Sequence, residues 1–585
     1  MIATIPAVFP LAFAVAMLAV LPRNLGHLVA ALAAVGVTAQ AVFMPAGPHL
    51  ATTFLGFEVI FQNIDQFSRL MGIIFGFITV LAVTFAWGSD TPKRTTALAV
   101  SYVTATFGAV YAGDWLVLIF WWELMAVTST VLVWARGGAA IRSGYRYALF
   151  HGIGGTLLLA AVIVHFANTG TFIYAATGID PAATVLAALG IGVNCGFIFL
   201  HSWLPDAYPS PHFSASVFMS VFTTKTAVYT MYRAFPEGGL WLAYLGGLMT
   251  VYGAAFALMQ YDPRRLLSYH IQGQVGYMLA GVGLAGAVGD LAVAGGFAHV
   301  FNHVIYKSLL FMVVGVIIYR TGIEDIRDMG GLWRVMPVTF VVYLVASASI
   351  ASVPGFNGFI SKGMIIDSAH DFADPAAVGG PEVLLGEGLL WWLLIIGGVG
   401  TFLSFIKLGY YMFFHGTASV DPPEATPLQM GAMAVAGVSC VALGVFWESL
   451  LVVIPFSAEV IPELKPYSMS HIVESMALMI SGFVGFFALR SPLATLSHYA
   501  RDIDSLLYPA AFYTTRGFVW GVTELWAFVD RATMRLAAAS VYVGTNPRTV
   551  AARMGVGPEL RAGIGRSVFV LTALVAAVLG VLLFG

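Results

Sequence analysis

Apolar runs of 18 or more residues recur along almost the entire chain, and this repetition constrains the fold more than any other feature. Of the 585 residues, 59% are hydrophobic and only 10% are charged. A soluble protein carries about 25% charged residues. Each apolar run is long enough to cross a bilayer as a helix. The sequence therefore predicts an all-α polytopic membrane protein with about 14–16 transmembrane helices.

The basic residues are distributed unevenly between the loops that join the apolar runs. The candidate spans lie near residues 2–22, 25–45, 68–88, 95–112, 115–134, 148–168, 181–203, 213–235, 239–260, 270–287, 291–319, 335–353, 388–414, 427–454, 471–490 and 565–584. An external N-terminus places these basic residues in cytoplasmic loops: Arg23, Lys93, Arg94, Arg136, Arg142, Arg146, Arg264, Arg265, Arg320, Arg327 and Arg334. The opposite loops hold little beyond Arg69, Arg233 and Lys465. The positive-inside rule thus predicts a bacterial inner-membrane protein with both termini on the periplasmic side.

Residues 491–564 are too polar to cross a membrane, yet they contain an amphipathic helix pattern. From residue 516 to 536 the apolar side chains fall on one helical face: Phe518, Val522, Leu525, Val529 and Leu536. Glu524, Arg531 and Arg535 fall opposite. We expect a lateral helix on the cytoplasmic surface, lying either on lipid or as a strap against other spans or a partner subunit. Residues 565–584 then form a final anchoring span.

Five ionisable side chains fall inside or at the break of the predicted spans. They are Glu123, Lys225, Lys307, Lys362 and Lys407. A central charge costs roughly 2.5–3.5 kcal/mol to insert, so such residues need partners, water or a function. The alternative is a static ion pair or a side chain that reaches the surface, and it weighs most for Lys407, near a span end.

Three titratable residues recur every fourth position in the segment "AHVFNHVIYKSLLF": His299, His303 and Lys307. This spacing places them on one face of a helix. Two histidines one turn apart can bind a metal, but Lys307 would repel a cation and no nearby carboxylate completes a coordination shell. Histidine titrates near neutrality, so the stripe favours a proton relay through internal water over a metal site.

Two spans contain helix-breaking residues. "HSWLPDAYPSPHF" (201–213) carries three prolines, and "SVPGFNGFISKG" (352–363) places Pro354, Gly355 and Gly358 near Lys362. Irregular backbone at membrane depth is tolerated only against protein or a wet cavity. Paired interruptions in the two halves predict two inverted repeats, each with a broken helix, and an ion path between them.

Other classes of function find no support in the sequence. The two cysteines have no metal-ligand spacing, and there is no phosphate-binding loop of the G-x-x-x-x-G-K-[ST] type. "GVGLAG" (281–286) lies in an apolar segment without a preceding strand, so it favours helix packing. We therefore expect no cofactor, no bound metal, no nucleic-acid partner and no redox site, which is typical of a transporter subunit rather than an enzyme.

Eight ordered motifs carry a family resemblance across roughly residues 110–416. They are "FWWELMAVTS", "LHSWLPDAYP", "TTKTAVYTMYR", "DPRRLLSYHIQGQVGYM", "FNHVIYKSLLF", "DMGGLWRVMP", "PGFNGFISK" and "GTFLSFIKLGYYMFF". With these motifs the chain resembles the antiporter-like subunits shared by respiratory complex I and Mrp-type multisubunit Na⁺/H⁺ antiporters. It resembles the Mrp D subunit most, with a C-terminal lateral-helix extension.

The resemblance implies roles for individual residues. Glu123 matches the membrane-embedded glutamate that acts on a lysine of the N-terminal half-channel, and Lys225 matches a lysine on the following helix. His299, His303 and Lys307 match the central relay. Lys362 matches the ionisable residue of the second broken helix, near the exit. These residues would form a polar axis across the subunit, with Asn194, His201 and Lys407 as candidates for the same path.

One position departs from the family pattern. The lysine that usually precedes the histidine of "LH-x-WLP" by seven residues is Asn194 here, and the proline two residues before that histidine is Phe199. An amide hydrogen-bonds water but does not exchange a charge near neutral pH. Either Lys225 takes the missing role, or the N-terminal half does not conduct.

The resemblance also implies an order of regions and a function. The regions are N-terminal helices (1–112), a first antiporter-like repeat (113–260), a second (261–416), C-terminal helices (417–490), the lateral helix region (491–564) and a terminal span (565–585). The expected function is ion translocation by one component of a hetero-oligomeric membrane complex, moving H⁺ alone or in exchange for Na⁺. The alternatives are a proton-channel subunit of an energy-coupled inorganic-carbon uptake complex, or a non-conducting structural subunit.

Overall fold

The computed structural model describes residues 5–373, 388–418, 420–456, 464–499, 502–555 and 560–584. The chain divides into two compact units, Met1–Asp504 and Ser505–Gly585. Within the described residues, nine helices are long and apolar enough to cross a membrane, and four shorter apolar helices accompany them. The predicted all-α polytopic membrane fold is therefore confirmed.

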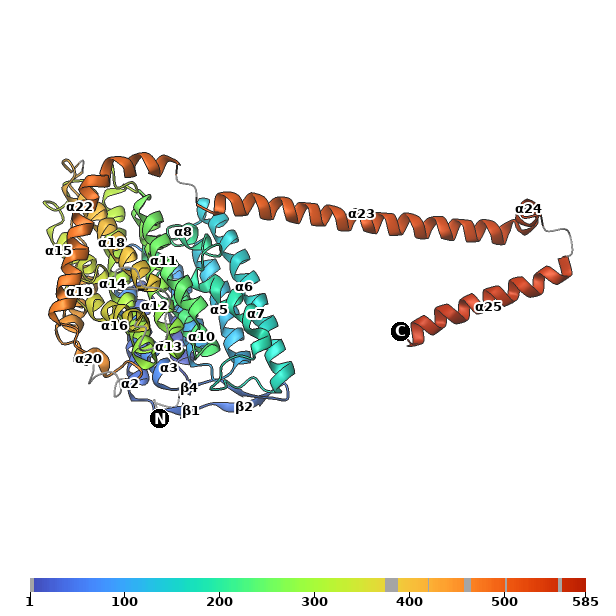
Figure 1. The fold of residues 1–585 in the computed structure, drawn as a ribbon, viewed down its shortest axis with the longest axis horizontal. Coiled ribbons are helices and arrows are strands. Elements are labelled where there is room, and N and C mark those ends of the chain that lie inside the picture. The colour runs from blue at the N-terminus through green and yellow to red at the C-terminus, as the bar shows by residue number, and fades with distance from the viewer. Residues whose placement is uncertain are drawn as a thin grey trace. The chain divides into compact units, whose positions relative to one another are not determined.

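Six helices open the first unit, and each coincides with a predicted span (Figure 1). They are α1 (Val8–Val20), α2 (Arg23–Phe43), α3 (Gln66–Trp87), α4 (Lys93–Tyr111), α5 (Trp115–Trp134) and α6 (Ala139–Thr169). Side-chain caps set two of their starts. Asp65 and Ser68 form a capping box on α3, and the Asp114 carboxylate accepts from Val117 N at 2.8 Å at the start of α5.

A small β-structure that the sequence did not predict lies between α2 and α3. Strand β1 (Gly47–Pro48) pairs with β4 (Asn63–Ile64), and β2 (Ala51–Phe54) pairs with β3 (Phe57–Ile60), both antiparallel. Leu55 and Gly56 form the two-residue turn with φ of 52° and 85°. Two successive positive φ angles match the type I′ turn that suits the twist of a hairpin.

The next part of the chain contains the first broken helix. Its elements are η2 (Pro181–Ala183), α7 (Thr184–Cys195), α8 (Trp203–Ala207), α9 (Phe213–Met219), α10 (Phe222–Ala234) and α11 (Leu240–Leu258). Gly196 takes a left-handed conformation at the end of α7, with φ of 71°. The predicted interruption near 201–213 is confirmed. The predicted single span 213–235 is wrong in detail, because Ser220 and Val221 separate α9 from α10.

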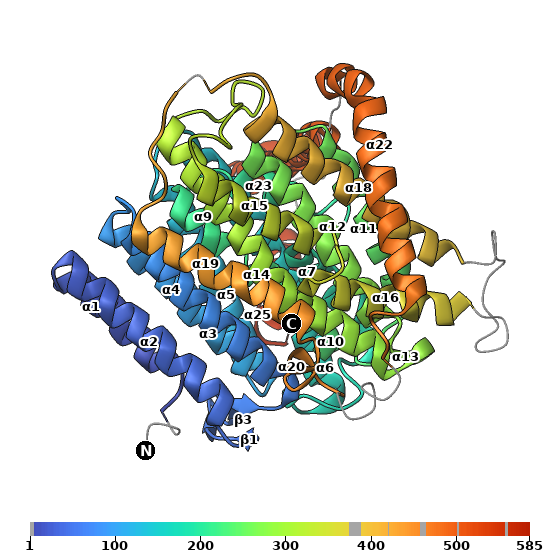
Figure 2. The same cartoon turned by 90° about the vertical axis from the view of Figure 1, so that its left-hand side faces the viewer.

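The second half of the first unit is built around one helix. Its elements are α12 (Pro263–Gly283), α13 (Ala285–Val288), α14 (Asp290–Thr321), α15 (Pro337–Ile350), α16 (Asn357–Ala373), α18 (Leu389–Gly409) and η3 (Tyr410–Phe414). Every residue of α14 from Ala292 to Ile318 is buried. Helices α12, α15, α16 and α19 (Pro427–Val445) pack around it (Figure 2).

The second predicted break is confirmed, with one correction. Residues 351–356 separate α15 from α16, and Ser352 has a φ of 65° there. We expected Lys362 at the break itself, but it lies within α16, a helix that was not counted as a span. The reason is that the helix resumes at Asn357 and includes Gly358, although Pro354, Gly355 and Gly358 together indicated irregular backbone in the sequence.

Two further helices, α20 (Glu448–Leu451) and α22 (Met469–Tyr499), follow α19 in the first unit. The second unit consists of α23 (Asp504–Thr545), α24 (Pro547–Arg553) and α25 (Leu560–Phe584). Helix α23 has 42 residues, twice the length of the predicted amphipathic segment 516–536. On its polar face Glu524 and Arg531 approach to 3.9 Å. The predicted final span, 565–584, lies within α25.

Candidate functional site

The predicted stripe of titratable residues lies on α14, at the centre of the first unit. His299, His303 and Lys307 have side chains with no exposed surface. The rings of His299 and His303 have centroids 6.2 Å apart. Because protein surrounds α14 on all sides, the stripe faces neighbouring helices and not the outer surface of the bundle.

His299 makes the most contacts of the three. Its Nδ1 lies 3.0 Å from Ser361 Oγ on α16, and its Nε2 lies 3.2 Å from Gln274 Oε1 on α12. The Tyr306 hydroxyl lies 3.3 Å from the same Nε2. Hydroxyl and imidazole groups both donate and accept hydrogen bonds. This network can therefore pass a proton between His299 and the hydroxyls of Tyr306 and Ser361, while the Gln274 amide of α12 holds the ring in place.

His303 and Lys307 have a different environment. Within the described residues, neither ring nitrogen of His303 nor Nζ of Lys307 has a hydrogen-bond partner. The Lys307 Nζ lies 6.0 Å from the ring centroid of Phe405. An unpartnered buried polar group costs about 1–3 kcal/mol, and internal water is the usual partner in proteins. The environment of these side chains therefore fits a hydrated site.

Lys225, on α10, is the buried lysine of the first half. Its Nζ donates to the Ser220 carbonyl at 2.7 Å and to Thr224 Oγ1 at 3.0 Å. The Ser220 carbonyl is available because the helix stops between α9 and α10. Lys225 is fully buried and close enough to His303 for the two groups to interact electrostatically.

Lys362 occupies a similar position in the second half. Its Nζ donates to the Ile350 carbonyl at 2.7 Å, across the break between α15 and α16. The same Nζ lies 4.7 Å from the ring centroid of Tyr277. Lys362 also interacts electrostatically with His299. In each half, a buried lysine therefore binds a carbonyl that an interrupted helix leaves free.

Glu123 lies apart from these groups. It is half-buried on α5 in an apolar groove of about 690 Å³, whose lining includes Phe54, Phe120 and Leu159. Its carboxylate packs closely on Gly155 of α6. Within the described residues it makes no hydrogen bond or ion pair. Glu123 thus has no charge partner among the residues that the structure describes.

Asn194 is another polar side chain in the interior of the first half. It is fully buried on α7, and neither atom of its amide group has a hydrogen-bond partner within the described residues. His151 on the adjacent helix α6 is also buried, with its Nε2 unpartnered and its ring stacked on Tyr147 at 3.9 Å. The sequence did not single out His151, because one histidine in an apolar run gives no periodic signal.

His201 contacts a residue 301 positions away. Its Nε2 lies 3.3 Å from the Asp502 carboxylate, to which the hydroxyls of Tyr252 and Tyr269 also donate. Burial raises the pKa of Asp502, but the hydrogen bonds and charge of His201 and the tyrosines outweigh it and lower this pKa to about 2. Asp502 therefore stays ionised at neutral pH.

Lys407 makes contacts typical of a helix cap. Its Nζ donates to the Leu258 carbonyl at 2.6 Å and to the Gln260 carbonyl at 2.8 Å, at the C-terminal end of α11. A cation at this end of a helix is favourable. The geometry supports the structural alternative for this lysine, and no contact joins it to the α14 stripe within the described residues.

Three functional candidates on α12 were missed: His270, Gln274 and Tyr277. They follow one another by four and three residues and share one helical face. The His270 ring lies 4.9 Å from Phe405, the ring that also faces Lys307. The same periodic spacing that identified the α14 stripe would have found them within "HIQGQVGY".

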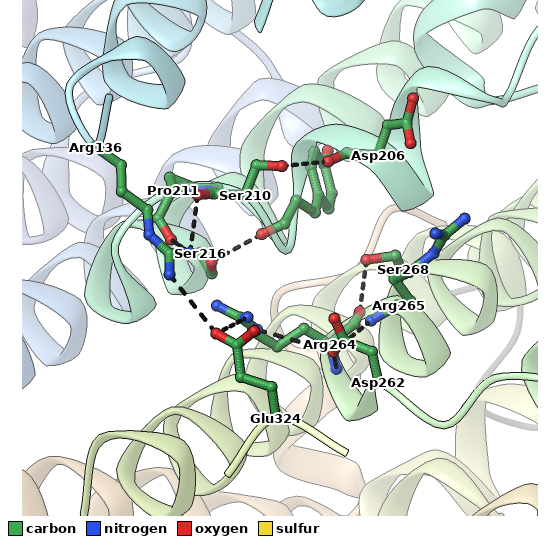
Figure 3. A network of polar contacts seen from close by, with 11 residues as sticks. Arg136, Asp206, Ser210, Pro211, Ser216, Asp262, Arg264, Arg265, Ser268 and Glu324 are labelled. Atoms are coloured by element: carbon green, nitrogen blue, oxygen red, sulfur yellow. Dashed lines mark hydrogen bonds and ion pairs between the residues drawn. The ribbon is translucent and has the colours of Figure 1, made fainter. Parts of the chain in front are cut away.

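A network of charged residues joins the loop at Arg136, the start of α12 and the loop at Glu324 (Figure 3). Glu324 Oε1 lies 3.6 Å from Arg136 and 2.9 Å from Arg264. Arg146 and Asp206 pair at 2.6 Å. The network lines a polar cavity of about 550 Å³. Its arginines belong to loops that the positive-inside pattern assigns to the cytoplasm.

Comparison with known proteins confirms the predicted resemblance. Residues 112–378 match the family described as NADH:quinone oxidoreductase/Mrp antiporter, transmembrane. The A1 subunit of the Na⁺/H⁺ antiporter of Staphylococcus epidermidis is 29% identical over 357 residues, 56% of this chain and 44% of that protein. A Rhizobium meliloti protein, named as the probable A/B subunit of a K⁺/H⁺ antiporter, is 31% identical over 330 residues, 52% of this chain and 33% of that protein.

A solved structure shows the same fold. A chain of respiratory complex I from Thermus thermophilus with bound NADH superposes with a TM-score of 0.67 at 20% identity, covering 82% of this chain and 99% of that one. The chain spans less than half the length of the two curated relatives. Both of those are named as A-type subunits, so the D-type assignment and the match of the C-terminal extension stay predictions.

Proposed function

We propose, from the match of residues 112–378 to the NADH:quinone oxidoreductase/Mrp antiporter transmembrane family, that this chain is an ion-translocating subunit of a multisubunit membrane complex. It moves protons along a buried polar axis, in exchange for a monovalent cation. The relatives are named for Na⁺ in one case and for K⁺ in the other, so both cations belong in the transport assay.

The observation that carries this proposal is the burial of α14 together with the polar groups around it. A stripe of two histidines and a lysine costs insertion energy in the membrane. Here the stripe sits between Lys225 on one side and the Ser361 hydroxyl and the Lys362 ammonium on the other. The order of groups from α10 to α16 supports a continuous path across the subunit.

The chemistry of the path is proton exchange between neighbours. Lysine ammonium groups give up a proton, imidazoles take one on one nitrogen and release one from the other, and water fills the space between unpartnered atoms. A positive charge that arrives at Lys225 repels a proton on His303. In the same way, a positive charge on His299 repels a proton on Lys362. Such electrostatic coupling passes charge without large movements of the helices.

The position of Glu123 supports a partner subunit. Its carboxylate opens into an apolar groove on the surface of the bundle, beside the exposed side chains of Phe120 and Val127. A carboxylate facing lipid alone is unfavourable. We propose that another membrane subunit covers this groove and supplies the charge that Asn194 does not. The complex lies in a bacterial inner membrane, with the termini of this chain on the periplasmic side.

Deletion of the chromosomal gene tests the proposed function. In everted membrane vesicles energised by respiration, a pH-sensitive dye reports the collapse of the proton gradient when a cation is added. We expect the wild-type response to Na⁺ or K⁺ to be lost on deletion and restored by the full-length chain. An unchanged response to both cations in the deletion strain would contradict an exchange function.

The packing of Gly155 on Glu123 gives a finer test of the first half. A methyl group at Gly155 would meet the Glu123 carboxylate, so Gly155→Ala displaces it. A positioned proton-transfer group contributes about 10²–10⁴-fold, and displacement removes part of this, so we expect a loss of transport of about tenfold. Gly152→Ala on the same helix is the control, because Gly152 is exposed and has open space around it. Equal transport by both variants would show that the carboxylate position does not matter.

A further inference from the structure

A small cavity lies between α16 and α22, next to Lys362. Its volume is about 30 Å³, which is room for one or two water molecules. The polar residues that line it are Ser352, Lys362, Asp367, His471, Glu474 and Ser475. Helix α22 lies outside the segment that matches the family, so the resemblance assigns no role to its side of this cavity.

The residues on α22 that line the cavity recur with helical spacing. His471, Glu474, Ser475 and Leu478 follow one another at steps of three, one and three residues, and so share one face. Lys362, Ile366 and Asp367 present the facing stripe of α16. Two helix faces rich in ionisable groups therefore meet here, although α22 is otherwise strongly apolar.

An ion pair closes the outer rim of the cavity. His471 Nε2 lies 2.8 Å from Asp367 Oδ1, and their side chains are 21% and 29% exposed. Lys362, five residues before Asp367 on α16, is only 3% exposed. The cavity therefore runs from a buried ammonium at its inner end to a partly exposed ion pair at its rim.

Contacts at the inner end tie α22 to the broken helix. Ser475 Oγ donates to the Ser352 carbonyl at 2.7 Å, and Ser352 holds the left-handed backbone conformation in the break. The Tyr277 ring lies against Lys362 Nζ and interacts electrostatically with Glu474. Glu474 is thus close to the side chains that surround the Lys362 ammonium.

The cavity lies toward the end of the bundle that is remote from the charged network of Arg136 and Arg264. The short helix α20, which precedes α22, lies at the end that carries the β-strands, whereas α8 lies at the opposite end (Figure 1). Asp206 of α8 belongs to the charged network. By the positive-inside pattern, the rim of the cavity faces the outside.

We propose that the first two turns of α22 form the outer gate of the proton path, with Glu474 as the acceptor of the proton that Lys362 releases. The inference rests on the proposed function. The Lys362 ammonium transfers a proton to the Glu474 carboxylate, directly or through a cavity water, which leaves a neutral amine and a carboxylic acid. The acid then passes the proton to outside water when the His471–Asp367 pair separates, and Lys362 is reprotonated from the His299 network.

Four single variants, tested in everted vesicles at matched amounts of membrane-inserted chain, separate this inference from the proposed function. We expect Lys362→Ala and Glu474→Gln each to lower transport at least about tenfold, and Glu474→Asp to retain a substantial part. Glu448→Gln is the control, since Glu448 is an exposed carboxylate on the nearby helix α20. Loss in Lys362→Ala with full transport in Glu474→Gln would overturn the gate alone. Full transport in Lys362→Ala would overturn the proposed function.

The side of the gate is tested by labelling, which does not depend on transport. Both native cysteines, Cys195 and Cys440, are buried, and Ser475→Cys places a thiol in the cavity. Ser475 is only 5% exposed, so a reagent reaches this thiol when the rim of the cavity opens. We expect a membrane-impermeant thiol reagent to modify it in right-side-out vesicles and not in everted ones. Adding Asp367→Asn breaks the rim pair and should raise the labelling rate severalfold. Labelling from the cytoplasmic side only, or an unchanged rate in the double variant, would contradict an outer gate.

Discussion

Replacing Lys307 by methionine is expected to abolish transport while making the chain more stable. Lys307 is fully buried on α14, and its Nζ has no hydrogen-bond partner within the described residues. Methionine has a similar length and shape, and it removes the polar group from this apolar setting. A buried polar group without a partner costs about 1–3 kcal/mol, so its removal is expected to stabilise the chain by a similar amount.

The loss of transport follows from the position of the same amine. Lys307 lies one helical turn from His303 and faces the Phe405 ring that also contacts His270. Without a titratable group there, a proton has no carrier in this part of the stripe. We expect transport to fall at least about tenfold, and further if Lys307 is obligatory. Such opposite changes in stability and activity are typical of functional sites.

Dye measurements in everted vesicles and thermal aggregation of the detergent-solubilised chain check the two effects separately. Lys465→Met is the matched control, because Lys465 is an exposed lysine in a loop. It should change neither quantity. A Lys307→Met chain that transports normally would show that the stripe is structural. A chain that loses both transport and stability would show that the amine has a stabilising partner. It would contradict the expectation that Lys307 lowers the stability of the chain.

The part of the site that could be predicted from sequence is the part encoded by short-range periodicity. The steps of four residues between His299, His303 and Lys307 fix a shared face wherever a helix forms. Proline and glycine at 354, 355 and 358 likewise located the second break. The same reasoning would have identified His270, Gln274 and Tyr277, whose spacing is equally regular.

The rest could not be predicted because it depends on which helices meet. His201 finds Asp502 across 301 residues, and Asp367 finds His471 across 104. Neither pair leaves a local pattern in the sequence. The hairpin at Leu55 and Gly56 was missed for another reason, since its strands are only a few residues long and lie between two strongly apolar spans.

Lys225→Met is expected to lower transport as far as Lys307→Met does. This result would settle whether the first half takes part despite Asn194. Lys225 donates to the Ser220 carbonyl at 2.7 Å, where the helix stops between α9 and α10. In the second half Lys362 makes the same kind of bond at 2.7 Å to Ile350. This likeness supports the proposal that each lysine lies on the proton path of its own half.

The link from Lys225 to the centre is electrostatic. In the proposed path, a charged Lys225 would disfavour a proton on His303, so a proton that reaches Lys225 would drive the next one along α14. Asn194 contributes no charge to this step, whichever way its amide points. Removing Lys225 therefore leaves the central histidine without its only lysine neighbour among the described residues of the first half.

The matched variant is Thr224→Val, which keeps the ammonium and removes one of its two acceptors. It should retain most of the transport seen by the dye, whereas Lys225→Met should lose at least about tenfold. Normal transport by Lys225→Met would mean that only the second half conducts, with protons reaching His303 by another route. In that case Gly155→Ala would also be neutral, because Glu123 could act only through the first half. Loss of transport in both Lys225→Met and Gly155→Ala would place Glu123 and Lys225 on one path. Lys225 would then hold the role that a lysine at position 194 holds in the family pattern.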